Sequence, residues 1–162
     1  MSQSPPSVTL RPATPDDEEF LLQLFASTRE EFRFLDGDER QKEALIKMQY
    51  DLRRIQYDAA YPEAAASIIL LEDRAVGRIL IDESEQNILL VDIALLPEHR
   101  NTGIGTRLIR QLLDRAVSVK KPVRLQVLKS SPAGRLYHRL GFSPVSDQSM
   151  YVEMLFEPVG LS

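Results

Sequence analysis

The feature that most constrains the fold is the apolar run at residues 88–96. It reads Ile-Leu-Leu-Val-Asp-Ile-Ala-Leu-Leu, and Asp92 is its one charged residue. The run is far shorter than the roughly 20 residues of a membrane span, and Pro97 ends it. A strand with no polar alternation is typical of a position that is covered on both faces. We therefore expect residues 88–96 to form a central strand of a sheet.

A glycine-rich turn follows this strand and opens a helix. The turn is Arg100-Asn101-Thr102-Gly103-Ile104-Gly105, and apolar residues at helical spacing predict a helix over 104–117. The two glycines let the backbone approach a ligand and aim N–H groups at an anion on the helix N-terminus. A pyrophosphate-bearing cofactor needs this arrangement, although such turns also occur simply as tight connections.

The remaining patterns predict a mixed α/β fold. A capping-box-like sequence at Thr14–Asp17 begins one helix, and Leu45, Met48, Leu52 and Ile55 mark a second. Residues 72–75 read as a hairpin turn, with a bulge suggested at Gly77. Further strands are expected at 8–11, 67–71, 76–81, 123–127 and 150–156, and a short helix at 132–140.

Composition limits the classes of function. The 162 residues, 43% hydrophobic and 27% charged, predict a single domain over 8–162 after a disordered tail at 1–7. No apolar stretch is long enough for a membrane span and no signal peptide is evident, so we expect a cytoplasmic protein without a membrane partner. With no cysteine and two histidines, we expect no metal site. The net charge of −4 argues against nucleic acid and suits an amine substrate.

Two motifs and the order of elements resemble the GCN5-related N-acetyltransferases (GNAT). The first motif is Leu-Pro-Glu-His-Arg-Asn-Thr-Gly-Ile-Gly-Thr at 96–106, and the second is Ser-Pro-Ala-Gly-Arg-Leu-Tyr-His-Arg-Leu-Gly-Phe at 131–142. The resemblance extends from Val8 to about Phe156. It implies an α/β fold with a mixed central sheet of about six to seven strands, about four flanking helices and a V-shaped splay between the two central strands.

The resemblance also implies acetyl-coenzyme A as co-substrate, without a metal. The pantetheine arm would pair with the strand backbone like an added β-strand. The pyrophosphate would lie on the turn, where Asn101 replaces a frequent glycine and tolerates positive φ, and Thr102 replaces a residue that is often basic. Ser131, or Ser130, stands where the family has an asparagine that touches pantetheine. The cofactor-binding residues expected on this basis are Ile93, Ala94, Leu95, Arg100, Asn101, Thr102, Gly103, Ile104, Gly105, Thr106 and Ser131.

Tyr137 matches the family tyrosine that protonates the departing coenzyme A thiolate. A thiol pKa of about 8.5 lies below a phenol pKa of about 10, so a tyrosine can act as this general acid at neutral pH. The alternative is that Tyr137 is only a half-buried aromatic residue on a short helix.

The general base is not clear from the sequence. Some family members place a glutamate where this chain has Gln126, and an amide cannot serve. Asp92 is our first candidate, as a tentative base or water relay, because a lone carboxylate in an apolar strand is costly; a purely structural hydrogen bond is the alternative. The weaker candidates are Glu30, Glu31 and Glu83, and His99 and His138 read as surface residues.

Gln49, Tyr50, Tyr57 and Tyr61 lie on or just after the second helix, which walls the acceptor site in the family. They could select the acceptor, or they could be packing residues.

These residues predict an N-acetyltransferase that moves an acetyl group to an amine of a small molecule or peptide by direct attack in a ternary complex. The absence of cysteine excludes an acyl-cysteine intermediate. A non-catalytic acyl-coenzyme A-binding module or sensor is an alternative that Gln126 favours. An unrelated nucleotide binder is disfavoured because the Gly-Lys-Ser/Thr of a P-loop is missing. The acceptor, the acyl chain and the oligomeric state stay open, a homodimer included.

Overall fold

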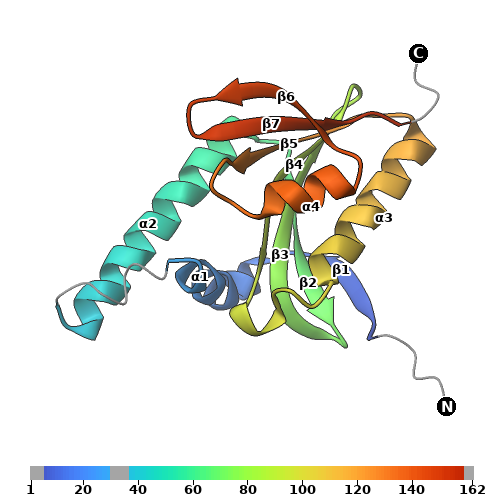
Figure 1. Cartoon of the computed structure of the whole chain (residues 1–162). Coiled ribbons are helices and arrows are strands. Elements are labelled where there is room, and N and C mark those ends of the chain that lie inside the picture. The colour runs from blue at the N-terminus through green and yellow to red at the C-terminus, as the bar shows by residue number, and fades with distance from the viewer. Residues whose placement is uncertain (1–5, 30–36, 159–162) are drawn as a thin grey trace. The chain divides into compact units, whose positions relative to one another are not determined.

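The computed structural model describes residues 6–29 and 37–158. Residues 1–5 of the expected tail lie outside the described part, and Ser7 donates its N–H to the Glu72 carboxylate at 2.8 Å. The elements are β1 (Val8–Pro12), η1 (Pro15–Asp17), α1 (Glu18–Ser27), α2 (Glu39–Ala60), β2 (Ala65–Leu71), β3 (Arg74–Glu83), β4 (Ile88–Leu95), η3 (Pro97–His99), α3 (Ile104–Val119), β5 (Val123–Leu128), α4 (Ala133–Arg139), β6 (Ser143–Gln148) and β7 (Tyr151–Phe156) (Figure 1).

The seven strands form one mixed sheet in the order β1-β2-β3-β4-β5-β7-β6, which confirms the predicted fold class. The residue patterns alone indicated every strand except β6. Its sequence, Ser-Pro-Val-Ser-Asp-Gln, is polar and almost fully exposed. A strand at the sheet edge tolerates proline and needs no apolar face, so it carries no periodic signal.

The chain groups into two compact units. The first is Met1–Arg78 with Ala94–His99, and the second is Ile79–Ile93 with Arg100–Ser162. Strands β3 and β4 pass through both. The single domain expected over 8–162 stays a prediction.

The start of the first unit is held by one buried carboxylate. Asp17 is 7% exposed and accepts hydrogen bonds from the Arg11 guanidinium at 2.8 and 2.7 Å and from the Thr14 N–H at 2.8 Å. These bonds, that of Arg11 first, lower the pKa of Asp17 to about 2. Because Arg11 belongs to β1, which pairs antiparallel with β2, the ion pair joins this pair of strands to the entry of α1.

Helix α2 is present as predicted, but its apolar stripe is not buried. Met48, Leu52 and Ile55 are 60%, 55% and 61% exposed. The buried residue of α2 is instead Tyr50, whose ring meets Phe25 of α1 edge-on at 5.7 Å. The spacing of the apolar residues therefore predicted the helix correctly, but it did not indicate which face of α2 packs on α1.

The second unit follows its sequence pattern closely. The apolar stripe that predicted α3 is buried, and β5 alternates between buried and exposed residues. The buried residues of α3 are Ile104, Leu108, Ile109, Leu112, Leu113 and Ala116. Gly141 ends α4 with φ 107° and donates its N–H to the His138 carbonyl. Strand β5 pairs antiparallel with β7 along its whole length, and β7 pairs with β6 (Figure 1).

The parallel pairing of β4 with β5 is short. It joins Ile88–Leu90 to Val123–Leu125, and both strands then continue, to Leu95 and Leu128. This divergence fits the expected splay between the central strands. Ile88 and Leu90 are buried, whereas every side chain from Val91 to Leu95 is partly exposed. Ile88 and Leu90 share one face of β4, and Leu89 on the other face is also partly exposed, so the expected coverage on both faces is not seen.

We expect Asp17→Asn to destabilise the protein by about 1–2 kcal/mol, because it removes a charge-assisted bidentate bond and weakens the cap. The depressed pKa of Asp17 makes its contribution full above about pH 5, and it is lost as the pH falls toward 2. The free energy of unfolding, measured with urea at pH 7 and at pH 3, should therefore differ less between the variant and the wild type at pH 3 than at pH 7. Asp16→Asn, at an exposed neighbouring carboxylate, is the control, and equal losses in both variants would contradict the assignment.

Candidate functional site

The C-terminal end of β4 is held at close range by Gly77 of β3. A Cβ at residue 77 would overlap the Ala94 carbonyl oxygen and come within 2.8 Å of Leu95 Cδ2. The Leu96 N–H donates to the Val76 carbonyl at 2.8 Å, so the two strands stay hydrogen bonded beside this contact. The close approach explains the glycine that suggested a bulge in the sequence, and it fixes the backbone at two expected pantetheine-binding residues.

The glycine turn has the backbone that an anion site requires. Asn101 has φ 59°, so asparagine does adopt the left-handed conformation there, and Gly103, with φ 90°, is the N-cap of α3. A Cβ at Gly103 or Gly105 would have no neighbour within 4 Å. The glycines therefore face open space at the start of a 16-residue helix, whose N-terminus attracts negative charge. This geometry fits a pyrophosphate group.

Tyr137 is a buried residue of α4, and its ring meets Phe142 edge-on at 5.7 Å. Burial raises the pKa of Tyr137 above 10, and the negative charge of Asp92 raises it further. The two predicted catalytic residues are therefore near enough for their charges to interact. A phenol with a raised pKa stays protonated at neutral pH, as a proton donor must.

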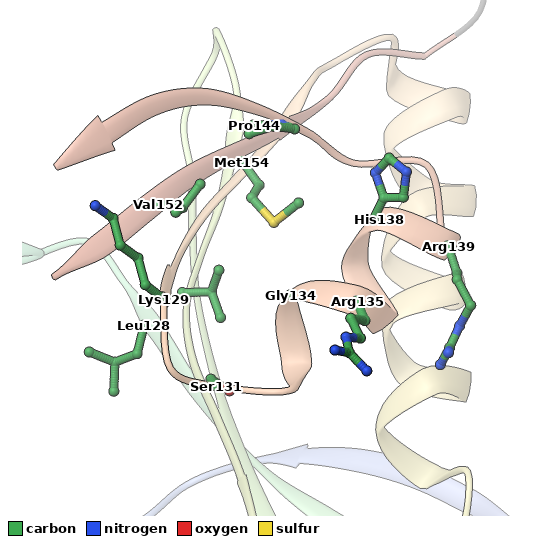
Figure 2. Close-up of a pocket in the computed structure, with 11 residues that line it drawn as sticks. Leu128, Lys129, Ser131, Gly134, Arg135, His138, Arg139, Pro144, Val152 and Met154 are labelled. Atoms are coloured by element: carbon green, nitrogen blue, oxygen red, sulfur yellow. The ribbon is translucent and has the colours of Figure 1, made fainter.

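A pocket of about 560 Å³ lies between the end of β5, α4, β6 and β7 (Figure 2). Ser131, an expected pantetheine contact, lines it, and the Ser131 hydroxyl accepts the Ala133 N–H at 3.1 Å. Figure 2 shows Met154 directed toward α4. Tyr137 is not a lining residue: helical spacing places it on the other side of α4 from Gly134, Arg135, His138 and Arg139.

Of the other acid and base candidates, Glu83, His99 and His138 lie in the described part of the chain. Glu83 is held by Arg115 at 2.8 Å and by Lys121 at 3.1 Å, and these bonds lower the pKa of Glu83 to about 2, so it is a poor proton acceptor. Glu30 and Glu31 lie outside the described residues. His99 ends η3 and His138 is exposed on α4.

Gln126 lies opposite Glu153 in the register of β5 with β7, and Glu153 forms an ion pair with Arg124. The sequence patterns gave no reason to select Glu153, because only the strand register places it opposite Gln126.

The aromatic residues of α2 pack within the first unit. Tyr50 is buried against Phe25, and Tyr57 meets Tyr61 edge-on at 6.2 Å. Gln49 is half-buried. The guanidinium of Arg53 lies over Tyr57, at 4.9 Å from the ring centroid. The sequence had indicated the tyrosines of this region but not the arginine that covers one of them.

Within residues 6–29 and 37–158, no three His, Cys, Asp or Glu side chains gather in a way that could hold a metal ion. None of the helices in the described ranges is long and apolar enough to cross a membrane. The cytoplasmic location stays a prediction.

Comparisons with known proteins agree on one family. The model of the acetyltransferase (GNAT) family matches residues 21–142. The fold is similar to a PaiA N-acetyltransferase from Thermoplasma acidophilum in complex with coenzyme A, at 18% identity and TM-score 0.66, over 93% of this chain and 99% of that one. It is also similar to an acetyltransferase from Thermus thermophilus, at 18% identity and TM-score 0.67, over 93% and 97% of the two chains. No curated protein sequence matches this chain.

We expect Gly77→Ala to displace the backbone of β4 at Ala94, because the added methyl group cannot fit against its carbonyl oxygen. The variant should lose about 1–3 kcal/mol of stability, the usual cost of overpacking, and bind acetyl-coenzyme A at least tenfold more weakly. Gly105→Ala, which adds a methyl group in open space, is the control for thermal unfolding. A Gly77→Ala protein with wild-type stability and affinity would show that this contact does not position β4.

Proposed function

The chain belongs to the acetyltransferase (GNAT) family, and we propose that it transfers the acetyl group of acetyl-coenzyme A to an amine of a small molecule or peptide. The observation that carries the proposal is the turn at Asn101–Gly105. Its left-handed residues and its glycines beside open space support an anion cradle at the start of α3. Few other functions of a strand-to-helix turn require both left-handed residues and glycines beside open space, directly after a strand that splays from its neighbour.

The two ends of the cofactor would use different parts of the chain. The pyrophosphate would accept N–H groups from residues 101–106, where the dipole of α3 adds about 0.3–1 kcal/mol. The pantetheine amides would pair with the backbone of Ile93, Ala94 and Leu95, beyond the point where β4 leaves β5. Ser131 would contribute one hydroxyl at the start of α4.

The proposed reaction is a direct acyl transfer. The neutral amine attacks the thioester carbonyl carbon, and the C–S bond then breaks to release the coenzyme A thiolate. Tyr137 donates its phenolic proton to this thiolate and is reprotonated from solvent. The proton lost by the amine passes to Asp92, directly or through water. Positioning of the two substrates supplies most of the rate.

A non-catalytic acyl-coenzyme A-binding module is the second candidate. The amide of Gln126, where family members can have a glutamate, favours it. Such a module would bind the cofactor through the same turn and would release no coenzyme A.

Calorimetric titration and thiol release test the proposal. We expect acetyl-coenzyme A to bind and ATP not to compete, and we expect free thiol when the complex meets an accepted amine. Gly105→Glu should abolish binding while the chain stays folded, because its side chain enters open space and places a carboxylate where the phosphates would lie. Gly105→Ala adds a small uncharged side chain at the same position and should weaken binding less than Gly105→Glu, which separates the effect of the carboxylate from that of a side chain.

Tight ATP binding without coenzyme A binding would overturn the proposal. Cofactor binding without thiol release across amines, amino acids and peptides would favour the sensor.

We expect Tyr137→Phe to lower kcat by about 10²-fold with little change in cofactor affinity, the usual contribution of a general acid. Phenylalanine keeps the ring contact with Phe142, so the fold should be retained. Because burial and the charge of Asp92 raise the pKa of Tyr137 from its usual value, the wild-type rate should show no loss from tyrosine deprotonation between neutral pH and about pH 9. Tyr151→Phe, on the exposed part of β7, is the control. A wild-type kcat in Tyr137→Phe would remove the assigned role.

A further inference from the structure

The pocket of about 560 Å³ in the second unit is used only in part by the proposed reaction. Of its lining residues, Ser131 alone has a proposed role in cofactor binding, and Tyr137 does not line it. Every lining residue belongs to the second unit, so the pocket is complete within that unit. Its volume lies in the range of roughly 300–1,000 Å³ that is typical of small-molecule sites.

The inner part of the pocket is apolar. Val127 and Met154 are buried, and Val152, the partner of Val127 in the register of β5 with β7, is half-buried. Figure 2 shows Met154 of β7 directed toward α4 across this space. Methionine is unbranched and adapts its shape to a neighbour. This lining favours an apolar body over a group that forms hydrogen bonds.

Gly134 keeps this apolar space open. It lies in the first turn of α4, where glycine is a poorer helix former than alanine. A Cβ at residue 134 would meet only Val127 Cγ1, at 4.0 Å, which is an ordinary contact. The immediate packing therefore does not require glycine, and a larger side chain at this position would enter the pocket.

The mouth of the pocket is basic, although the net charge of the chain is −4. The basic lining residues are Lys129, Arg135, His138 and Arg139, and none of the described residues that line the pocket is acidic. Lys129 forms an ion pair with Asp147. Within the described part of the chain, the exposed side chains of Arg135 and His138 have no hydrogen bond or ion pair. An anion would therefore displace no partner from either side chain.

Arg135 and His138 can act on the same anion. They are three residues apart on α4, so their side chains are neighbours on the helix surface. A guanidinium binds a carboxylate through two parallel hydrogen bonds, and an imidazole ring can donate one more in either protonation state. One guanidinium beside an imidazole suits the single charge of a carboxylate better than the roughly two charges of a phosphate monoester.

We propose that this pocket binds a carboxylic acid with an apolar body. The carboxylate lies on Arg135 and His138, and the body packs on Val127, Val152 and Met154. Because apolar groups partly enclose the ligand, water screens its ion pair less than it screens one on an open surface. The inference does not depend on the proposed acetyl transfer, since binding an acid requires neither the thioester nor the tyrosine on α4.

Matched acids and amides test the inference. Octanoate is compared with octanamide, and 3-phenylpropionate with 3-phenylpropanamide, by calorimetric titration of the full chain with and without saturating coenzyme A. We expect at least one acid to bind at least tenfold more tightly than its amide, a preference that coenzyme A leaves in place. The pair that responds distinguishes a linear body from an aromatic one.

Variants of α4 then assign the binding to this pocket. Arg135→Gln should reduce the preference for the acid at least fivefold. Arg139→Gln is the matched control and should reduce it much less, because Figure 2 shows Arg139 directed away from Met154. Gly134→Leu should abolish binding of acid and amide without lowering the thermal unfolding temperature, since leucine covers the apolar lining and favours the helix. Gly134→Ala adds one methyl group and should weaken binding less than Gly134→Leu.

Four results would overturn the inference. They are equal binding of acids and amides, no binding of any probe, an equal loss of preference in Arg135→Gln and Arg139→Gln, and unchanged binding in Gly134→Leu. Loss of acid binding in the presence of coenzyme A would assign the pocket to the cofactor and would also overturn it. The acetyl transfer is tested by thiol release, so the two proposals can fail independently.

Discussion

The early end of the pairing between β4 and β5 is the constraint on which the proposed site depends. Hydrogen-bonding groups of a strand must find partners, and β4 continues for five residues after its register with β5 stops at Leu90. On the β3 side, Gly77 allows so close an approach that the end of β4 cannot shift freely. A strand held on one edge and released from its neighbour on the other can accept an extended, amide-bearing ligand as an additional strand.

The parts of the fold that local patterns specify were predictable from the sequence. The apolar run at 88–96, the stripe of α3 and the alternation of β5 each reflect the contacts of a single element with one layer of core. The turn could also be predicted, because positive φ is a local property that selects glycine at 103 and tolerates asparagine at 101. These elements carry the cofactor half of the proposed site.

The features of the structure that depend on contacts between residues far apart in the sequence could not be predicted from local patterns. Strand β6 is defined by its pairing with β7, and the position of Glu153 opposite Gln126 is a consequence of strand register. The spacing of the apolar residues of α2 predicted a helix, yet its buried residue is Tyr50, which packs against the ring of Phe25. The rings of Phe25 and Tyr57 are covered by Arg29, Arg53 and Arg78, which come from three separate segments, and no short window of sequence contains all three arginines.

The charge of the whole chain and the chemistry of the proposed reaction place opposite demands on the amine. A net charge of −4 favours the approach of a protonated amine, which is the form that most amines have at neutral pH. Salt screens this attraction beyond about 10 Å, so it acts on the encounter more than on the bound complex. The amine must then lose its proton before attack, because a protonated nitrogen has no lone pair for the thioester carbon. The proposed proton acceptor, Asp92, serves this step, and its position in β4 places it on the same strand as the backbone proposed to hold the pantetheine arm.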